Sequence, residues 1–176
     1  RPEAIFSGRR VVQYLYKSAC AGGAAQTAGM PSARQHKGEK PMILGIGTDL
    51  CEVARMEKSL THAGFAAHVF SGGELALLET RKGAARAQTA AANFAAKEAF
   101  LKACGTGLAG FALAEIGVLR EASGAPRYAL EGRAAAWAAA NRVTAHLSLT
   151  HEAGLACAFA VLEQPDPPAG SQGGDL

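Results

Sequence analysis

The sequence predicts an α+β domain with a largely antiparallel sheet and a long central helix. Segments typical of strands and helices follow one another in the order β-α-α-α-β-β-α-β-β, which is the pattern of this class. The chain has 176 residues, enough for one domain with its own core. Hydrophobic residues make up 49% but aromatic residues only 6%, so alanine supplies much of the apolar content and favours closely packed helices.

The first half of the domain is predicted to begin with a buried strand over residues 42–50, followed by a short helix over 52–61. A second helix is expected after Ser71, because Ser71 and Glu74 have the spacing of a capping box. The longest helix is predicted over residues 89–104, which are rich in alanine and contain no glycine or proline. The glycine that follows is suited to end that helix.

The second half is predicted to form two pairs of antiparallel strands separated by a short helix. Its expected elements are a strand over 115–121, a turn over 123–126, a strand over 127–130, a helix over 133–141, and strands over 143–150 and 155–162. A Glu-Ala-Gly segment joins the last two strands and indicates a hairpin.

Composition divides the chain into three parts. Residues 1–41 carry seven Lys or Arg against two Glu, a charge of +5, and show no sustained hydrophobic periodicity. We interpret them as an upstream or introduced arm, with Met42 as a natural start, or as a mitochondrial transit peptide. Residues 42–163 form the predicted domain, and residues 164–176, rich in proline and glycine, form a predicted flexible tail.

Charge and cysteine spacing argue against several classes of protein. From residue 42 onward, 11 Lys or Arg stand against 13 Asp or Glu, a charge of −2, so a nucleic-acid-binding domain is not expected. No apolar run approaches the roughly 20 residues of a membrane-spanning helix. The four cysteines show no C-x-x-C spacing, which argues against a zinc site or a disulfide framework and fits a reducing compartment. Three are expected to be small buried hydrophobic residues: Cys51, Cys104 and Cys157.

The first candidate for chemistry is the Gly-Ile-Gly-Thr-Asp segment that ends at Asp49. It lacks the third glycine of a dinucleotide-binding loop, since residue 50 is leucine, and it lacks the Gly-Lys-Ser/Thr of a P-loop. Its two glycines allow another backbone to approach the strand closely. Asp49 is therefore either a functional carboxylate at a strand end or the cap of the helix that follows.

The second candidate lies in the long helix, where Glu98 and Lys102 are four residues apart and share a face. An exposed ion pair of this kind stabilises a helix by only about 0.3 kcal/mol. Alternatively, the pair brings a carboxylate for a metal ion next to a cation for phosphate oxygens. Spacing alone leaves both interpretations open.

The third candidate is the segment from His146 to His151, which reads H-L-S-L-T-H. Strand alternation places His146, Ser148 and Thr150 on one face, where they line a ligand surface or face solvent. The odd spacing puts His151 on the other face, so a two-histidine metal site is not expected. A serine hydrolase is not expected either, because no G-x-S-x-G elbow is present.

Taken together, these segments resemble the holo-acyl-carrier-protein synthase family, the small phosphopantetheinyl transferases. The family's first signature is a strand ending in G-I-G-x-D, found here at residues 45–49. Its second is the long and specific motif F/W-A-x-K-E-A-x-x-K-A-x-G-T-G, found at residues 94–107. A Gly-x-Pro turn at 124–126 and the motif H-x-S-x-S/T-H at 146–151 complete the resemblance, which covers residues 42–163.

The resemblance implies a 4′-phosphopantetheinyl transferase-like fold and a specific reaction. Members of the family transfer the 4′-phosphopantetheine arm of coenzyme A to a serine of apo-acyl carrier protein and release adenosine 3′,5′-bisphosphate, in support of fatty acid biosynthesis. The resemblance also implies Mg²⁺ as cofactor, a cytoplasmic location, and a homotrimer whose active sites are shared between neighbouring subunits. Nucleic acid and membrane partners are not expected.

The family's motifs also imply roles for individual residues. Asp49 and Glu98 are the expected ligands of Mg²⁺, an ion that prefers oxygen atoms. Glu98 or a water on the metal is the expected base for the serine hydroxyl. Lys102 is expected to stabilise the transferred phosphoryl group or to protonate the leaving phosphate. Lys97, expected to reach coenzyme A phosphates, and Gly105 are the further expected substrate-binding residues.

The sequence also has a basic patch that could bind the carrier protein and two positions that depart from the family's pattern. Arg55 matches a family position that faces the acidic carrier, and Lys58 extends a basic patch beside it. Asn93 stands where the family usually has Arg before F-A-x-K-E, and His68 stands where Arg is frequent. These departures leave open an inactive member that only binds coenzyme A or the carrier. A Mg²⁺-dependent phosphohydrolase with the same two carboxylates is a further alternative.

Overall fold

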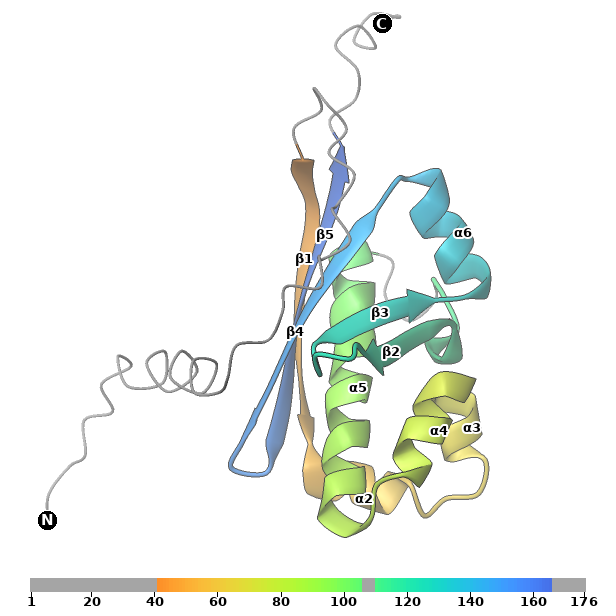
Figure 1. Cartoon of the computed structure of the whole chain (residues 1–176), viewed down its shortest axis with the longest axis vertical. Helices are drawn as coiled ribbons and strands as arrows, with labels where there is room; N and C mark the ends of the chain where they lie inside the picture. The colour runs from red at the N-terminus through yellow and green to blue at the C-terminus, as the bar shows by residue number, and fades with distance from the viewer. Residues whose placement is uncertain (1–40, 106–109, 166–176) are drawn as a thin grey trace, which may run out of the picture. The chain divides into compact units, whose positions relative to one another are not determined.

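The computed structural model describes residues 41–105 and 110–165, and its elements confirm the α+β class (Figure 1). In chain order they are β1 (Pro41–Glu52), α2 (Val53–Ser59), α3 (Phe65–Val69), α4 (Gly72–Glu79), α5 (Gly83–Cys104), a 3₁₀ turn (Leu113–Glu115), β2 (Ile116–Arg120), β3 (Pro126–Leu130), α6 (Gly132–Ala140), β4 (Thr144–Glu152) and β5 (Leu155–Pro165). Nearly all of the predicted arm and of the predicted tail lies outside the described residues, because β1 already includes Pro41 and β5 extends to Pro165. None of the described helices is long and apolar enough to cross a membrane.

The strands pair antiparallel, as the sequence predicted, but they form two separate sheets instead of one. The larger sheet has the strand order β1-β5-β4, and the smaller pairs β2 with β3. The β4–β5 hairpin turns through Ala153 and Gly154, whose φ angles are 49° and 80°. Positive φ at both central residues is what a type I′ turn requires, and this turn matches the right-handed twist of the strands.

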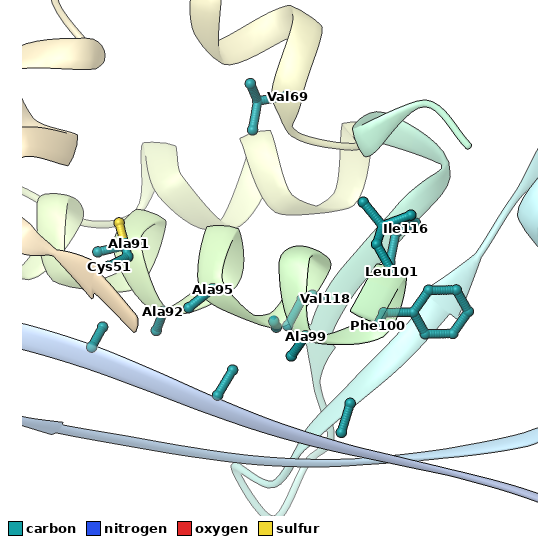
Figure 2. Close-up of a cluster of buried hydrophobic side chains, with 14 of the residues drawn as sticks. Cys51, Val69, Ala91, Ala92, Ala95, Ala99, Phe100, Leu101, Ile116 and Val118 are labelled. Atoms are coloured by element: carbon teal, nitrogen blue, oxygen red, sulfur yellow. The ribbon is translucent and has the colours of Figure 1, made fainter. Parts of the chain in front are cut away.

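Helix α5 packs against one face of the larger sheet and is the long central helix that the sequence predicted (Figure 1). Its sheet-facing side is lined by buried alanines such as Ala95 and Ala99 (Figure 2). Gly45 and Gly47 of β1 let the strand approach the helix, because a Cβ atom at either position would strike the α5 backbone at Ala103 or Ala99. The two glycines of the first motif therefore serve the close backbone approach that the sequence predicted.

A second side of α5 packs against α4 and the smaller sheet. The side chains buried there are larger, and they include Phe70, Leu78 and Ile116, none more than 1% exposed. Near the C-terminal end of α5, the Phe100 ring lies 5.1 Å from the Tyr128 ring, measured between centroids. Helix α5 is therefore buried on more than one side, which explains the predominance of alanine along it.

The starts of two helices differ from the prediction. Helix α3 was not predicted, and it follows Gly64, which has a φ of 80° and provides no side-chain cap. Helix α5 begins at Gly83, earlier than predicted, and Lys82 before it provides no cap either. Helix starts are recognised in a sequence mainly by capping side chains, so these two starts carried no signal. The predicted capping box is confirmed, because the Ser71 N–H donates to Glu74 Oε2 at 2.8 Å and the Glu74 N–H donates to Ser71 Oγ at 3.4 Å.

The face of the larger sheet turned away from α5, here called the outer sheet face, is covered by none of the described elements. Cross-strand pairing arranges it in three rows: Ile46, Val161 and His146; Thr48, Phe159 and Ser148; Leu50, Cys157 and Thr150. Among these, Ile46, Leu50 and Phe159 are 55%, 63% and 45% exposed. A contiguous exposed apolar patch of this kind indicates contact with another molecule.

Candidate active site

Asp49 lies near the C-terminal end of β1, on the face that meets α5. It follows Gly47 by two residues, so strand alternation directs it towards the helix. Lys102 of α5 donates from Nζ to Asp49 Oδ1 at 2.8 Å and to the carbonyl oxygen of Thr48 at 2.9 Å. The interpretation of Asp49 as a helix cap is wrong, because it lies within the strand and the residue before α2 is Glu52.

Glu98 joins Asp49 and Lys102 from the side of the helix. Burial raises the pKa of Glu98 above its ordinary value, repulsion from the Asp49 carboxylate raises it further, and the Lys102 ammonium opposes both. Interactions of this kind require that the two carboxylates and the ammonium lie near one another in a single subunit. We call these three side chains the carboxylate site. The helical spacing of Glu98 and Lys102 serves to bring both of them to Asp49.

The carboxylate site has a donor set that fits a magnesium ion. Mg²⁺ is usually bound by one or two carboxylates, while waters and substrate phosphates complete its coordination. Asp49 and Glu98 supply two carboxylates that repel each other and therefore favour a cation between them. Within the described residues, no group of three or more His, Cys, Asp or Glu side chains is placed to hold a metal ion. Two carboxylates alone would leave most of the coordination of such an ion to waters and substrate phosphates.

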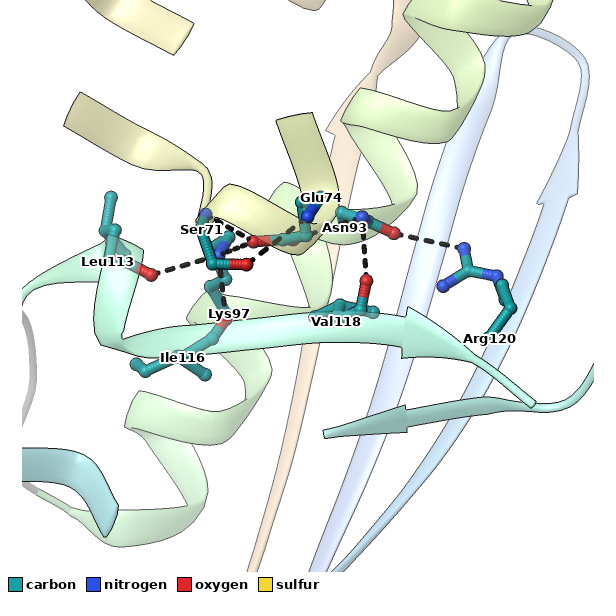
Figure 3. A network of polar contacts seen from close by, with 8 residues as sticks. All are labelled: Ser71, Glu74, Asn93, Lys97, Leu113, Ile116, Val118 and Arg120. Carbon is teal, nitrogen blue, oxygen red and sulfur yellow. Dashed lines mark hydrogen bonds and ion pairs between the residues drawn. The ribbon is translucent and has the colours of Figure 1, made fainter. Parts of the chain in front are cut away.

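A second polar cluster, the buried network, lies where α5 meets α4 and β2 (Figure 3). It is formed by the side chains of Ser71, Glu74, Asn93, Lys97 and Arg120. Lys97 Nζ donates to Glu74 Oε2 at 2.6 Å and to the carbonyl oxygens of Leu113 and Ile116 at 3.0 and 2.7 Å. These bonds use all three N–H groups of the ammonium. Both side chains of the Lys97–Glu74 pair are 0% exposed.

Asn93 extends the buried network towards the end of β2. Its Nδ2 donates to Glu74 Oε1 at 3.0 Å and to the carbonyl oxygen of Val118 at 3.2 Å. Its Oδ1 accepts a hydrogen bond from Arg120 Nη2 at 3.0 Å. The family usually has Arg at position 93; here the residue is Asn93, and the guanidinium of Arg120 reaches it from β2. Among the described side chains, no buried nitrogen or oxygen atom lacks a hydrogen-bond partner.

The position of Lys97 bears on its expected role. Burial lowers the pKa of Lys97, and the Glu74 carboxylate opposes this shift. Because its donors are all used inside the protein, this position does not favour the expected contact with coenzyme A phosphates, which stays a prediction. The sequence identified Glu74 only as part of a capping box. Its pairing with Lys97, 23 positions away, arises from the packing of α4 against α5 and carried no local signal.

Three further residues of the predicted site lie at the end of α5 and on α2. Gly105 ends α5 with a φ of 70°, and its N–H donates to the carbonyl oxygen of Lys102 at 3.1 Å. Arg55 and Lys58 are exposed and lie three residues apart on α2, the helix that begins directly after β1 and packs against α5. The helix-ending role of Gly105 is confirmed, while its contact with substrate stays a prediction. The docking role of Arg55 also stays a prediction.

The third predicted segment lies mainly on the outer sheet face. His146, Ser148 and Thr150 share that face, as predicted, and His146 Nε2 lies 2.9 Å from Glu163 Oε2. His151 falls on the opposite face, so the two histidines do not meet. His68, the second departure from the family, is exposed at the end of α3.

The described cysteines are free thiols. Cys51 is buried, as predicted, whereas Cys104 and Cys157 are only partly buried. Burial raises the pKa of Cys51, and it raises the pKa of Cys104 to about 12. Neither thiol is therefore activated as a nucleophile.

Fold and site together define a small α+β protein whose carboxylates and lysine suit a phosphate-bearing substrate. Solved structures with this fold include holo-acyl-carrier-protein synthases. The one from Neisseria meningitidis matches with a TM-score of 0.64 and 30% identity, and the match covers 70% of this chain and 100% of that protein. The one from Bacillus anthracis, in complex with coenzyme A (3′,5′-ADP), matches with a TM-score of 0.61 and 32% identity over 70% of this chain and 98% of that protein.

Sequence comparison leads to the same group. Residues 45–160 match the family model of the 4′-phosphopantetheinyl transferase superfamily. The holo-[acyl-carrier-protein] synthase of Methylobacterium sp. (strain 4-46) is 47% identical over 130 residues, which cover 69% of this chain and 95% of that relative. The one of Treponema denticola is 44% identical over 124 residues, covering 69% and 99%. The chain belongs to the 4′-phosphopantetheinyl transferase superfamily, which confirms the resemblance that its motifs indicated.

Proposed function

We propose that this chain transfers the 4′-phosphopantetheine arm of coenzyme A to a serine of apo-acyl carrier protein. The products are holo-acyl carrier protein and adenosine 3′,5′-bisphosphate. The relatives that the chain matches over nearly their full length are holo-acyl-carrier-protein synthases, and one solved relative is in complex with coenzyme A. The observation that carries the proposal is the convergence of Asp49, Glu98 and Lys102 in one site.

The carboxylate site suits the phosphoryl transfer. The serine oxygen attacks the phosphorus that carries the pantetheine arm, the bond from that phosphorus to the bridging oxygen breaks, and negative charge spreads over the phosphoryl oxygens. Mg²⁺ held by Asp49 and Glu98 would neutralise part of that charge and orient the diphosphate. The Lys102 side chain is 53% exposed, so its ammonium is free to exchange Asp49 for a phosphoryl oxygen or for the leaving phosphate.

Glu98 is the proposed base for the serine proton. Burial first, and then the Asp49 carboxylate, raise its pKa, which makes Glu98 a better proton acceptor than an ordinary surface glutamate. The proton passes from the serine hydroxyl to a Glu98 oxygen while the new oxygen–phosphorus bond forms. Gly105 remains a proposed substrate contact because it is exposed directly after the helix that carries both residues.

The proposal includes a homotrimer in which neighbouring subunits cover the outer sheet face. The exposed apolar side chains of Ile46, Leu50 and Phe159 support it, because burial of such a patch favours association. A mass by light scattering of three times 18.0 kDa would support the trimer. The mass of a single chain, maintained at micromolar concentration, would contradict it.

The acidic carrier protein is the proposed partner of the basic surface on α2. Arg55 and Lys58 are exposed there, next to the strand that carries Asp49, so a docked carrier would present its serine near the carboxylate site. A cytoplasmic location and a role in fatty acid biosynthesis belong to the same proposal, since they accompany the reaction that the family motifs imply.

The direct test is to incubate the chain with coenzyme A, Mg²⁺ and apo-acyl carrier protein and to weigh the carrier by mass spectrometry. A gain of one phosphopantetheine on wild-type carrier, and no gain on a carrier whose serine is replaced by alanine, supports the proposal. Binding of coenzyme A or carrier without any mass gain identifies an inactive family member instead. Cleavage of coenzyme A without modification of the carrier identifies a phosphohydrolase.

A further inference from the structure

The buried network fixes the orientation of the Asn93 side-chain amide from three directions (Figure 3). Its Nδ2 faces two acceptors, Glu74 Oε1 and the carbonyl oxygen of Val118, and its Oδ1 faces the guanidinium of Arg120. A guanidinium has donors but no acceptor, so it can pair only with the oxygen of the amide. A flipped amide would place Oδ1 against the Glu74 carboxylate and Nδ2 against Arg120, and all three partners oppose that arrangement.

Arg120 is the member of the network that comes from the edge of the domain. It ends β2 and is partly buried, and its Nη1 donates to the carbonyl oxygen of Leu119 at 3.3 Å. Burial lowers the pKa of Arg120, the Glu74 carboxylate opposes this, and neighbouring Arg81 lowers it further. Burial and Arg81 therefore both disfavour the charged form of Arg120 at this place, while the charge of Glu74 favours it and the bond to Asn93 gives the guanidinium a partner.

The network holds helix α5 next to the residues of the carboxylate site. Asn93 and Lys97 are four residues apart, share a face of α5 and are both tied to Glu74 of α4. Glu98 directly follows Lys97, and successive residues of a helix are turned by about 100°. The network therefore ties one side of α5 to α4 and β2, while Gly45 and Gly47 of β1 fit closely against another side.

We propose that Arg120 is a positioning residue for the transfer reaction. Through the amide of Asn93 it holds the Glu74–Lys97 pair, and with that pair the rotation of α5 that presents Glu98 to Asp49. The kinetic consequence rests on the function proposed above. The orientation of the Asn93 amide does not depend on that function and is measured separately.

The first measurement follows the Asn93 side-chain NH₂ group by NMR in ¹⁵N-labelled protein. Arg120→Met removes the guanidinium but keeps an aliphatic stem, and Arg120→Lys keeps a charge and a donor. Arg127→Met, at an exposed arginine on the adjacent strand β3, is the matched control. We expect the Asn93 signals to shift and broaden in Arg120→Met, to return towards wild type in Arg120→Lys, and to stay unchanged in Arg127→Met. Unchanged signals in Arg120→Met would overturn the proposal.

The second measurement is the rate of transfer to apo-acyl carrier protein. We expect kcat of Arg120→Met to fall by about tenfold to a hundredfold, the size associated with a displacement of ~1 Å at a reacting centre. The carrier KM should stay unchanged, and Arg120→Lys should recover part of kcat. Because Arg120 acts through Asn93, Arg120→Met should cause no further loss in an Asn93→Leu background. If Asn93→Leu does not fold, the recovery of kcat in Arg120→Lys decides whether Arg120 is a positioning residue.

The outcomes separate this inference from the proposed function. A wild-type kcat in Arg120→Met, or an equal loss in Arg127→Met, overturns the positioning role while transfer itself stands. If the wild-type protein leaves the carrier unmodified, the proposed function fails and the positioning role in transfer fails with it. In that case the NMR signals still decide whether Arg120 orients the Asn93 amide.

Discussion

Helix α5 contributes the lysines of two lysine–carboxylate pairs, which share their chemistry and differ in their surroundings. Lys97 Nζ lies 2.6 Å from Glu74 Oε2, and both side chains are 0% exposed. Lys102 Nζ lies 2.8 Å from Asp49 Oδ1, and these side chains are 53% and 19% exposed. The first ammonium donates to three acceptors inside the protein, while the second is open to solvent.

The difference in exposure suits one pair to a structural role and the other to a role in the proposed reaction. A buried pair whose hydrogen bonds are all satisfied cannot exchange a partner without leaving a charge uncompensated in the core. A partly exposed pair contributes little to stability and can exchange its partner for a substrate group at low cost. The same residue types, five positions apart on one helix, are therefore expected to serve different ends: Lys97 holds the helix, and Lys102 acts at the site.

The largest effect is expected when either carboxylate of the carboxylate site is removed. Asp49→Ala and Glu98→Ala should each reduce transfer by about 10³-fold or more, because each loses a group that acts on charge developing in the transition state. Mass spectrometry of the carrier measures the rate. The free energy of unfolding, measured in urea, should stay within about 1 kcal/mol of wild type. Normal turnover by either variant would refute the site assignment.

The two lysines should respond in opposite ways to the same substitution. Lys97→Met leaves Glu74 charged and uncompensated in the core, so it should lower the free energy of unfolding by about 3–5 kcal/mol. Lys102→Met should change that free energy by less than about 1 kcal/mol, because its pair is exposed. It should nevertheless lower kcat by about 10²-fold, through loss of charge stabilisation. Urea unfolding and transfer assays on both variants measure the contrast, and equal loss of stability in the two would break it.

A smaller effect is expected at the docking surface on α2. Arg55→Glu reverses a charge on the proposed docking surface for the acidic carrier, so it should raise the carrier KM by about tenfold or more, at a cost of roughly 1–2 kcal/mol. The KM for coenzyme A should change much less. Steady-state kinetics with each substrate varied in turn gives both values, and Lys82→Glu, at an exposed lysine outside α2, is the control. The opposite pattern of KM values would remove Arg55 from the docking surface.

The smallest effect is a shift in the pKa of Glu98 in the carboxylate site. Burial, followed by repulsion from Asp49, raises the pKa of Glu98, so its carboxyl should protonate at a higher pH than the value of about 4.3 for a free glutamate. Lys102 lowers that pKa, so Lys102→Gln should move it upward, whereas Asp49→Asn should move it downward. Carboxyl ¹³C NMR of the metal-free protein measures all three. Shifts in the reverse directions would show that the three groups do not share a site.

Much of the fold and of the carboxylate site could be predicted from the sequence. The capping box of Ser71 and Glu74, the alanine-rich helix and the final hairpin are local patterns, and all three formed, although the helix begins earlier than predicted. Spacing marked Asp49, Glu98 and Lys102 only as candidates, and the resemblance to the family's motifs assigned them to one site. The two glycines before Asp49 also signalled the close approach that brings these residues together.

The buried side of α5 could not be predicted in the same way. The bond between Asn93 and Arg120 joins residues 27 positions apart, and it depends on the packing of α5 against β2. In the sequence, Lys97 is indistinguishable from an exposed lysine that could bind phosphate, and only its 0% exposure reveals its structural surroundings. Helix α3 was missed for a local reason, since Gly64 before it offers no capping side chain.

The central claim is that Asp49 and Glu98 act as one site, and a double variant tests it most directly. The measurement compares kcat/KM for transfer in Asp49→Asn, in Glu98→Gln and in the protein carrying both changes. Groups that act as a unit lose little more when the second is removed. We therefore predict that the double variant is no slower than the slower single variant. Losses that multiply, or a wild-type rate in either single variant, would contradict the account.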